Sequence, residues 1–224
     1  MEEIKLLEID FSNASREIIE LLIDDPPDPS IFGEIVKANV TRPEILRFLC
    51  ESPDIPEEVR EQAHKALNLP VKPSSEIAKV KKKPEMRTQS LLQKVQRLSV
   101  GERRQLALRG GKDVRSILVR DPNKEVVLTV LENPKITETE VEIIARSRSI
   151  PEEVIRKITK KRDWMKKYEI LHAVITNPKT PPGIGVTLVI ELKTKDLTAL
   201  EKNKNVSEAI RIAAKRLLQW RKTH

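Results

Sequence analysis

Two segments of the chain begin with the same three residues: NPKITETEVEII starts at Asn133 and NPKTPPGIGVTL starts at Asn177. In each, a polar turn leads into a run of apolar residues, and the two starts lie 44 residues apart. That interval is within the roughly 40–47 residues of one helical-repeat unit. Asn39, in KANVTRPEI, lies 94 residues before Asn133, close to two such intervals. The recurrence predicts stacked pairs of helices.

The Asn-Pro-Lys turn is predicted to end one helix and to redirect the chain. Asparagine tolerates the left-handed backbone conformation that closes a helix, and proline cannot continue one. Helix starts follow a second pattern, in which Ser or Thr and a Glu three residues later form a capping box. Three pairs have this spacing: Thr41 with Glu44, Ser99 with Glu102, and Thr137 with Glu140. Val40 and Ile45 add the spacing of a hydrophobic staple, and IPEEV, at Ile55 and Ile150, places a proline at a helix start.

Apolar residues recur at helical spacing along the chain. In SREIIELLID they stand at Ile18, Ile19, Leu21 and Leu22, and VEIIA, from Val141, has a similar pattern that includes Ile143. The β-branched runs VVLTVL and VTLVIEL lie between helix-cap signals, so both are expected to be helical. Only 3% of residues are aromatic, so the core must consist of aliphatic side chains. The predicted fold class is all-α, an α-solenoid of stacked helix pairs.

Charge is distributed unevenly along the chain. Residues 1–69 contain 7 Lys and Arg against 16 Asp and Glu, a net charge of −9. Residues 70–224 contain 35 against 18, a net charge of +17. Between the two stretches, PVKPSSEIAKVKKKPE (70–85) is rich in Pro, Ser and Lys, as flexible linkers are. The sequence therefore predicts an acidic helical module (1–69), a tether (70–85) and a basic helical-repeat domain (86–224).

The segment VLENPKITETEVEIIARSRSIPEEVIRKI, residues 130–158, resembles the leucine-rich repeat variant, a HEAT-like bacterial repeat. The resemblance extends over about residues 90–218 and, more loosely, over residues 35–68. It implies an α-solenoid with a curved, non-catalytic binding surface. Some members of that family carry an iron–sulfur cluster, but this chain has a single cysteine, Cys50. No cofactor is therefore expected.

Residues that could support catalysis or metal binding are few. The three histidines, His64, His172 and His224, lack metal-ligand spacing, so no metal site is expected. Cys50 is expected to be a small buried hydrophobic residue. The glycines of RGGK (109–112) suit a helix end better than a phosphate cradle, and GIG (183–185) suits close helix packing. Asp163 beside Trp164 gives little support to a HEAT-like DNA glycosylase, and we expect the protein not to be an enzyme.

The basic stretch RKITKKRDWMKKY, from Arg156, contains seven Lys and Arg residues together with Trp164 and Tyr168. With ARSRS upstream, it is the candidate binding surface for an anionic or protein partner. The alternative is a solvated basic face on which Trp164 fills a gap between helices. The candidate residues are Arg146, Arg148, Arg156, Lys157, Lys160, Lys161, Arg162, Trp164, Lys166 and Lys167. Trp220 is a further aromatic, expected to cover the last hydrophobic layer.

These patterns favour a non-enzymatic adaptor that binds a protein through the solenoid surface. The alternative is a protein that binds nucleic acid or another polyanion through its basic C-terminal domain. Opposite charges also favour self-association, within one chain or between copies. The acidic N-terminus, MEEIKLLEID, lacks the features of a signal peptide, and no segment has the roughly 18 uninterrupted apolar residues of a spanning helix. The expected location is the cytoplasm, with no membrane partner.

Overall fold

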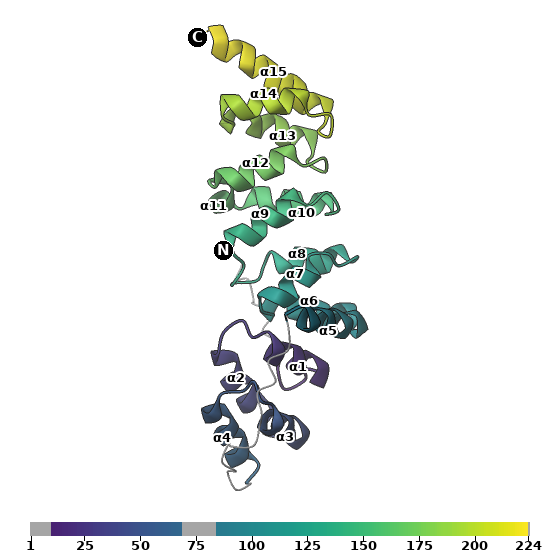
Figure 1. The fold of residues 1–224 in the computed structure, drawn as a ribbon, viewed down its shortest axis with the longest axis vertical. Coiled ribbons are helices and arrows are strands. Elements are labelled where there is room, and N and C mark those ends of the chain that lie inside the picture. The colour runs from purple at the N-terminus through teal and green to yellow at the C-terminus, as the bar shows by residue number, and fades with distance from the viewer. Residues whose placement is uncertain (1–9, 69–83, 224) are drawn as a thin grey trace. The chain divides into compact units, whose positions relative to one another are not determined.

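The structure is a computed structural model that describes residues 10–68 and 84–223. All the regular secondary structure in these residues is helical, and no β-strand occurs among them (Figure 1). This confirms the all-α fold class. The β-branched runs are helical as expected: VVLTVL lies in and just after α8 (Lys124–Val130), and VTLVIEL lies in α13 (Pro182–Leu188) and the 3-10 helix η2 (Val189–Glu191). Among the described helices, none is long and apolar enough to cross a membrane.

The chain divides into two compact units, which are described separately below. Unit 1 consists of residues 1–118 and 133–135, and unit 2 consists of residues 119–132 and 136–224. The helices of unit 1 are α1 (Arg16–Asp24), α2 (Ser30–Ala38), α3 (Pro43–Glu51), α4 (Glu57–Ala66), α5 (Pro84–Arg97), α6 (Val100–Arg109) and α7 (Lys112–Leu118). Those of unit 2 are α8, α9 (Glu138–Arg146), α10 (Glu152–Lys160), α11 (Arg162–Met165), α12 (Tyr168–Thr176), α13, η2, α14 (Thr194–Lys202) and α15 (Glu208–Thr223).

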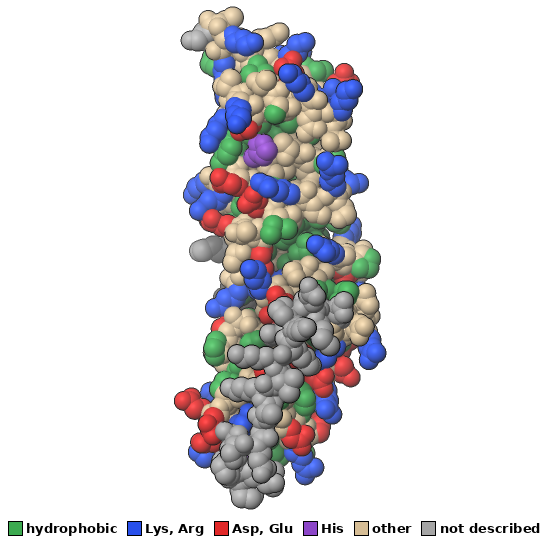
Figure 2. Space-filling view, in the orientation of Figure 1, with side chains coloured by type: hydrophobic (Ala, Val, Ile, Leu, Met, Phe, Trp, Pro, Cys, Tyr) green, Lys and Arg blue, Asp and Glu red, His purple; other side chains and the backbone are tan. Residues whose placement is uncertain are grey.

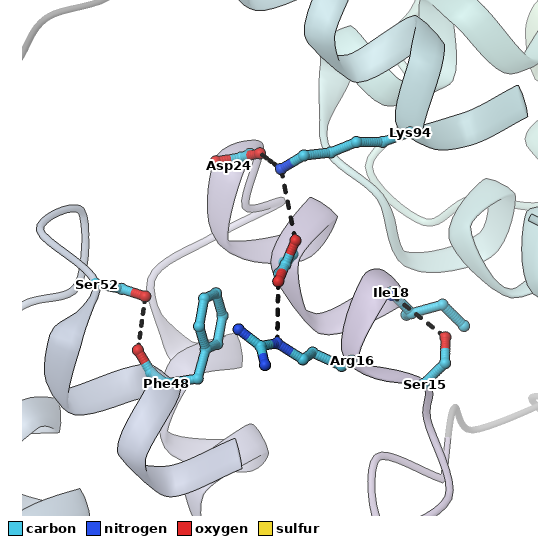
Figure 3. Close-up of polar contacts among 8 residues, drawn as sticks. Ser15, Arg16, Ile18, Asp24, Phe48, Ser52 and Lys94 are labelled. Carbon is cyan, nitrogen blue, oxygen red and sulfur yellow. Dashed lines mark hydrogen bonds and ion pairs between the residues drawn. The ribbon is translucent and has the colours of Figure 1, made fainter. Parts of the chain in front are cut away.

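In unit 1, α1 joins parts of the sequence that are far apart. It packs against α5 and α6, while α4 packs against α2 and α3. Lys94 of α5 donates to Asp24 of α1 (Nζ–Oδ2 2.6 Å) and lies 3.8 Å from Glu20 (Figure 3). Ser15, the N-cap of α1, donates to Glu102 of α6 (2.7 Å). The proposed modules 1–69 and 86–224 therefore share a compact unit; most of the proposed tether lies outside the described residues, and α5 begins at its residue 84.

In unit 2, the main contacts join helices that are at most three places apart in the order of the chain. α9 packs against α10 and α12, α10 against α8, and α15 against α13 and α14. One aliphatic core joins α12 to α15; its buried residues are Leu171, Ile175, Val189, Leu192, Leu197, Leu200, Val206, Ile210, Ala214 and Leu218. Gly185 of α13 lies so close to Ile210 of α15 that a Cβ atom there would clash with the isoleucine. The expected role of the GIG glycines in close packing is thus confirmed for Gly185, whereas Gly183 faces open space.

The repeated asparagines are buried, and their side chains, rather than a left-handed backbone, form the turns. Asn68 is the one described non-glycine residue with a positive φ, so the expected left-handed conformation is wrong for Asn39, Asn133 and Asn177. Asn177 has φ −78° and ψ 130°, and its Oδ1 accepts a hydrogen bond from the Lys179 N–H (2.8 Å). The corresponding bond of Asn133 is with the Lys135 N–H (2.9 Å).

The side-chain amide nitrogens of Asn133 and Asn177 also donate hydrogen bonds to the carbonyls at the end of an earlier helix. Asn177 Nδ2 donates to the carbonyls of Ala145 (2.6 Å) and Ser147 (2.8 Å), at the end of α9. Asn133 Nδ2 donates in the same way to Ala107 (3.0 Å) and Gly110 (3.3 Å), at the end of α6. The last carbonyls of a helix have no partner within the helix, so these buried amides satisfy groups that would otherwise be unpaired.

Two of the three proposed capping boxes are confirmed. The hydroxyls of Ser99 and Thr137 accept from the backbone of the glutamates three residues later, and those carboxylates accept from the cap N–H groups in return. The box at Thr41 is wrong, because α3 begins at Pro43 with Arg42 as N-cap and no side-chain cap bond. The staple there is wrong too, because Val40 is 55% exposed. In IPEEV, Pro56 and Pro151 are N-cap residues, one position before the first helical residue.

Candidate interaction site

The ten candidate residues lie at the end of α9, along α10 and α11, and just before α12. α10 places them because its apolar residues Val154, Ile155 and Ile158 are buried, which leaves the charged residues on the other side. Its first turn carries Glu152 and Glu153, and its last turn carries Lys157 and Lys160. This order suits the helix dipole, which favours acidic side chains at the N-terminus and basic ones at the C-terminus.

Two of the candidate lysines stabilise the end of another helix. Lys157 Nζ donates to the Leu128 carbonyl (3.0 Å) and contacts the Glu132 carboxylate, while Lys161 Nζ donates to the Leu131 carbonyl (3.1 Å). Leu128 and Leu131 belong to the last turn and C-cap of α8. Partial burial lowers the pKa of Lys161, with a smaller contribution from the Lys157 charge. These two cations therefore have a structural role.

Four other candidates form ion pairs on the surface. Their partners are Glu142 for Arg146 (2.6 Å), Glu152 for Arg156 (2.6 Å), Asp163 for Lys166 (2.9 Å) and Glu138 for Lys167 (2.9 Å). Exposed pairs of this kind contribute only about 0–1 kcal/mol each to stability. Their effect on the surface potential is larger, because each carboxylate neutralises a cation that a polyanion would need.

The remaining candidate cations are Arg148, Lys160 and Arg162. All three are exposed, and none forms an ion pair with another described residue. They lie at the end of the α9 segment, at the end of α10 and at the start of α11. Any direct contact with a phosphate would therefore depend mainly on these three side chains.

Trp164 is half-buried in α11, and Lys161 Nζ lies 4.1 Å from the centre of its ring. A lysine at that distance makes a cation–π contact, which holds the ring in place. The same contact occupies part of the aromatic face that a base would use for stacking. Trp164 is thus held against the C-cap of α10 through Lys161, and its side chain is only half-buried.

The other motifs have structural explanations. At RGGK, Asp25 accepts from the Gly111 N–H through its carbonyl (3.1 Å) and from the Val114 N–H through its carboxylate (2.8 Å), so an anion of the chain itself occupies the turn. His172 is half-buried beside Tyr168, with ring centres 6.3 Å apart. Cys50 is half-buried rather than fully buried, and partial burial raises the pKa of its thiol.

Five large apolar side chains in the described part of unit 2 are exposed and were not among the candidates, and three of them are more than half exposed. Ile143 is 61% exposed, Ile190 62% and Trp220 58%. Ile143 had been grouped with the core residues of α9, but only Val141, Ile144 and Ala145 of that group are buried. Trp220 was expected to cover the last hydrophobic layer, and its exposure shows that it does not. A helical-wheel comparison could have found Ile143, because it lies two residues after Val141 and therefore on the opposite side of the helix.

No cluster of three or more His, Cys, Asp or Glu side chains that could hold a metal ion occurs within residues 10–68 and 84–223. Comparison with known proteins gave no match to a family model, to a curated protein or to a solved structure. The functional argument therefore depends on the surface chemistry of the chain itself.

Proposed function

We propose that the protein is a non-enzymatic scaffold that binds another protein through the surface formed by α9, α10 and α11 of a HEAT-like helical repeat. The observation that carries this proposal is the mixed character of that surface. Four of its exposed cations are paired with carboxylates, and the strongly exposed Ile143 lies three residues before Arg146 on α9. Residues three apart in a helix lie on the same side.

Protein interfaces have this composition. Their energetically dominant residues are enriched in Trp and Arg, set among apolar side chains and surrounded by polar groups. Ile143 and Arg146 of α9 and Trp164 of α11 supply these three types on two helices that both pack against α10 and α12. A polyanion site would instead favour unpaired cations, since affinity for phosphates grows with the number of charges neutralised.

Site-specific photo-crosslinking tests the proposal. A photoreactive amino acid at Ile143 should form a discrete crosslinked product in a lysate of cells that naturally contain the protein. The control is the same group at Val40, an exposed apolar residue of unit 1. Loss of the product in an Arg146→Glu/Trp164→Ala variant would assign it to this surface. Identical products from both positions, or none from Ile143, would contradict the proposal.

Binding of a polyanion is the second candidate, supported by the unpaired cations Arg148, Lys160 and Arg162. Fluorescence anisotropy of labelled single-stranded and duplex oligonucleotides tests it, at about 50 and 200 mM salt. If it is correct, an Arg148→Ala/Lys160→Ala/Arg162→Ala variant should lose at least tenfold in affinity, while Lys166→Ala should have little effect. No binding by the full chain at low salt would exclude this candidate.

A further inference from the structure

The outer side of α15 continues the core of unit 2 to the surface. Ile210, Ala214 and Leu218 are buried in that core, and Ala213 and Leu217 pack against its edge. Trp220 lies three residues after Leu217, on the same side of the helix, yet it is 58% exposed. The apolar stripe of α15 therefore extends beyond the part that α13 and α14 cover.

Arg221 fixes the position of this stripe against η2. Its Nη2 donates to the Ile190 carbonyl (2.9 Å), and its Nη1 donates to the Leu192 carbonyl (2.8 Å). These bonds join the end of α15, which carries Trp220, to η2, which carries Ile190. Ile190 is 62% exposed, and Val186, four residues earlier, is 41% exposed. We call Val186, Ile190, Leu217 and Trp220 the α13–α15 face.

Positive charge predominates on α15, the helix that carries Leu217 and Trp220 of the α13–α15 face. α15 carries five basic residues, Arg211, Lys215, Arg216, Arg221 and Lys222, against one acidic residue, Glu208. Lys215, Arg216 and Lys222 are exposed. Arg216 lies four residues before Trp220 and on the same side of α15, whereas Lys215 and Lys222 lie on the other side of the helix. The exposed acidic residue next to Ile190 is Glu191 of η2. Figure 2 shows mainly Lys and Arg among the charged side chains over α13 to α15. Two such faces would repel each other, so the net charge of α15 favours an acidic partner.

The chain itself carries a surface of the opposite sign on α3 and α4. The exposed acidic residues there are Glu51, Asp54, Glu57, Glu58 and Glu61. None of them forms an ion pair with another described residue, and Arg60, the basic residue next to Glu61, is buried and donates to the carbonyls of Ser52 and Ile55. Figure 2 shows Asp and Glu side chains over this part of unit 1. Pro56, which is exposed between Asp54 and Glu57, adds an apolar contact surface.

We infer that the α13–α15 face of one molecule binds the acidic α3–α4 surface of a second copy, head to tail. Ile190 and Trp220 supply the apolar anchor, and Arg216 faces the carboxylates of the second copy, while Lys215 and Lys222 add to the positive potential of α15. Because the two surfaces differ, the contact is heterologous and links molecules in series. Opposite charges speed the encounter and fix the orientation. This inference does not depend on the partner of the α9–α11 surface, because it involves only the chain itself.

Sedimentation velocity of the purified full chain tests the inference at about 50 and 300 mM salt. We expect association that increases with protein concentration and weakens at least fivefold at the higher salt. Trp220→Ala and Ile190→Ala should each weaken it at least fivefold. Leu92→Ala is the control for Ile190→Ala, since Leu92 is an exposed apolar residue (42%) of α5 outside all the proposed surfaces, and it should leave association unchanged.

Two charge-reversal variants, examined separately and as a mixture, give the decisive comparison. A Lys215→Glu/Arg216→Glu variant and an Asp54→Lys/Glu61→Lys variant should each be monomeric alone, because like charges then face each other. When the two are mixed, every contact again joins opposite charges, and association should return. Circular dichroism checks that each variant keeps its helices.

Three results would overturn the inference. The first is a wild-type chain that stays monomeric at every concentration at low salt. The second is association that the α15 reversal leaves intact. The third is a mixture of the two variants that remains monomeric although each variant is folded, since this would show that the basic face binds something other than the α3–α4 surface.

Discussion

Units 1 and 2 use similar polar contacts over very different distances along the chain. In unit 1, the pairs Lys94–Asp24, Ser15–Glu102 and Val114–Asp25 join residues 70 to 89 positions apart. In unit 2, the amide bonds of Asn177 and the lysine bonds to the end of α8 span 25 to 32 positions. Unit 2 therefore closes through near neighbours, as a repeat does, whereas unit 1 depends on α1 meeting helices much later in the chain. The long stretch of chain between α1 and its partners must close into a loop before the contacts of unit 1 can form, and this closure costs conformational entropy.

The largest effect is expected where unit 1 closes, at Gly111. A Cβ atom at this position would overlap the Asp25 carbonyl, so Gly111→Ala must push α1 and α7 apart. We expect it to lower the free energy of unfolding of unit 1 by about 3 kcal/mol. Gly183→Ala is the control, because that glycine of α13 faces open space, and it should stabilise unit 2 by about 0.5–1 kcal/mol.

Urea unfolding can separate the two units. Trp164, Tyr168 and Trp220 all belong to unit 2, so tryptophan emission reports on that unit, while far-UV circular dichroism reports on both. Gly111→Ala should shift the circular dichroism transition more than the emission transition. Equal shifts in the two signals would show that the units unfold together.

The next effect concerns the closure of unit 2 at Asn177. Asn177→Ala removes two hydrogen bonds to the end of α9 and leaves the carbonyls of Ala145 and Ser147 without these partners. We expect a loss of about 2 kcal/mol in the emission-monitored transition. Asn203→Ala removes only a local bond of the kind that Asn177 makes with Lys179, in which the Asn205 N–H donates to Asn203 Oδ1 (3.0 Å), and should lose less than about 1 kcal/mol. If both variants lost the same amount, the bonds to α9 would not be the important ones.

Helix caps give a smaller contrast between the units. Thr137 caps α9 in unit 2, whereas Thr41, in a similar sequence of unit 1, makes no side-chain cap bond. Thr137→Ala should therefore lower stability by about 1 kcal/mol. Thr41→Ala should change it by less than about 0.5 kcal/mol. Urea midpoints from circular dichroism provide the comparison, and a large loss at Thr41 would mean that its hydroxyl caps α3 in solution.

The smallest effect is the pH dependence of the Ser15–Glu102 contact of unit 1. The hydrogen bond from the Ser15 hydroxyl, followed by that from the Ser99 N–H, lowers the pKa of Glu102 below its ordinary value of 4.5. The ionised form therefore stabilises the folded state above that pH, and this contribution disappears as the pH falls through the lowered pKa.

Glu102→Gln removes this titration. Because Glu102 is only partly buried and remains in contact with solvent, the difference from the wild type at neutral pH should be at most about 1 kcal/mol. It should shrink towards pH 3, as measured by urea midpoints between pH 3 and 7. A difference that grew at acidic pH would contradict the assignment of the lowered pKa to the folded state.

The sequence by itself determined that the chain is helical and where several of its helices begin. Apolar spacing and cap residues act within one turn of helix, so Ser99 and Thr137 could be identified as caps from their neighbours alone. The same local rule failed at Thr41, where Arg42 donates to the carbonyls of Ser12 and Ala14 and α3 begins one residue later. Arg42 and these partners are about 30 residues apart in the sequence, so a pattern read within one turn of helix could not reveal the contact.

The tertiary structure alone decided which cations have partners and which apolar side chains are exposed. Nearly all the candidate cations were visible in the sequence as one basic run, but the partners of Lys157, Lys161 and Lys167 lie on other helices. Exposure of Ile190 and Trp220 likewise depends on where α13 and α15 leave the core uncovered. A side chain's charge is a property of its residue, whereas its partners and exposure are properties of the packing.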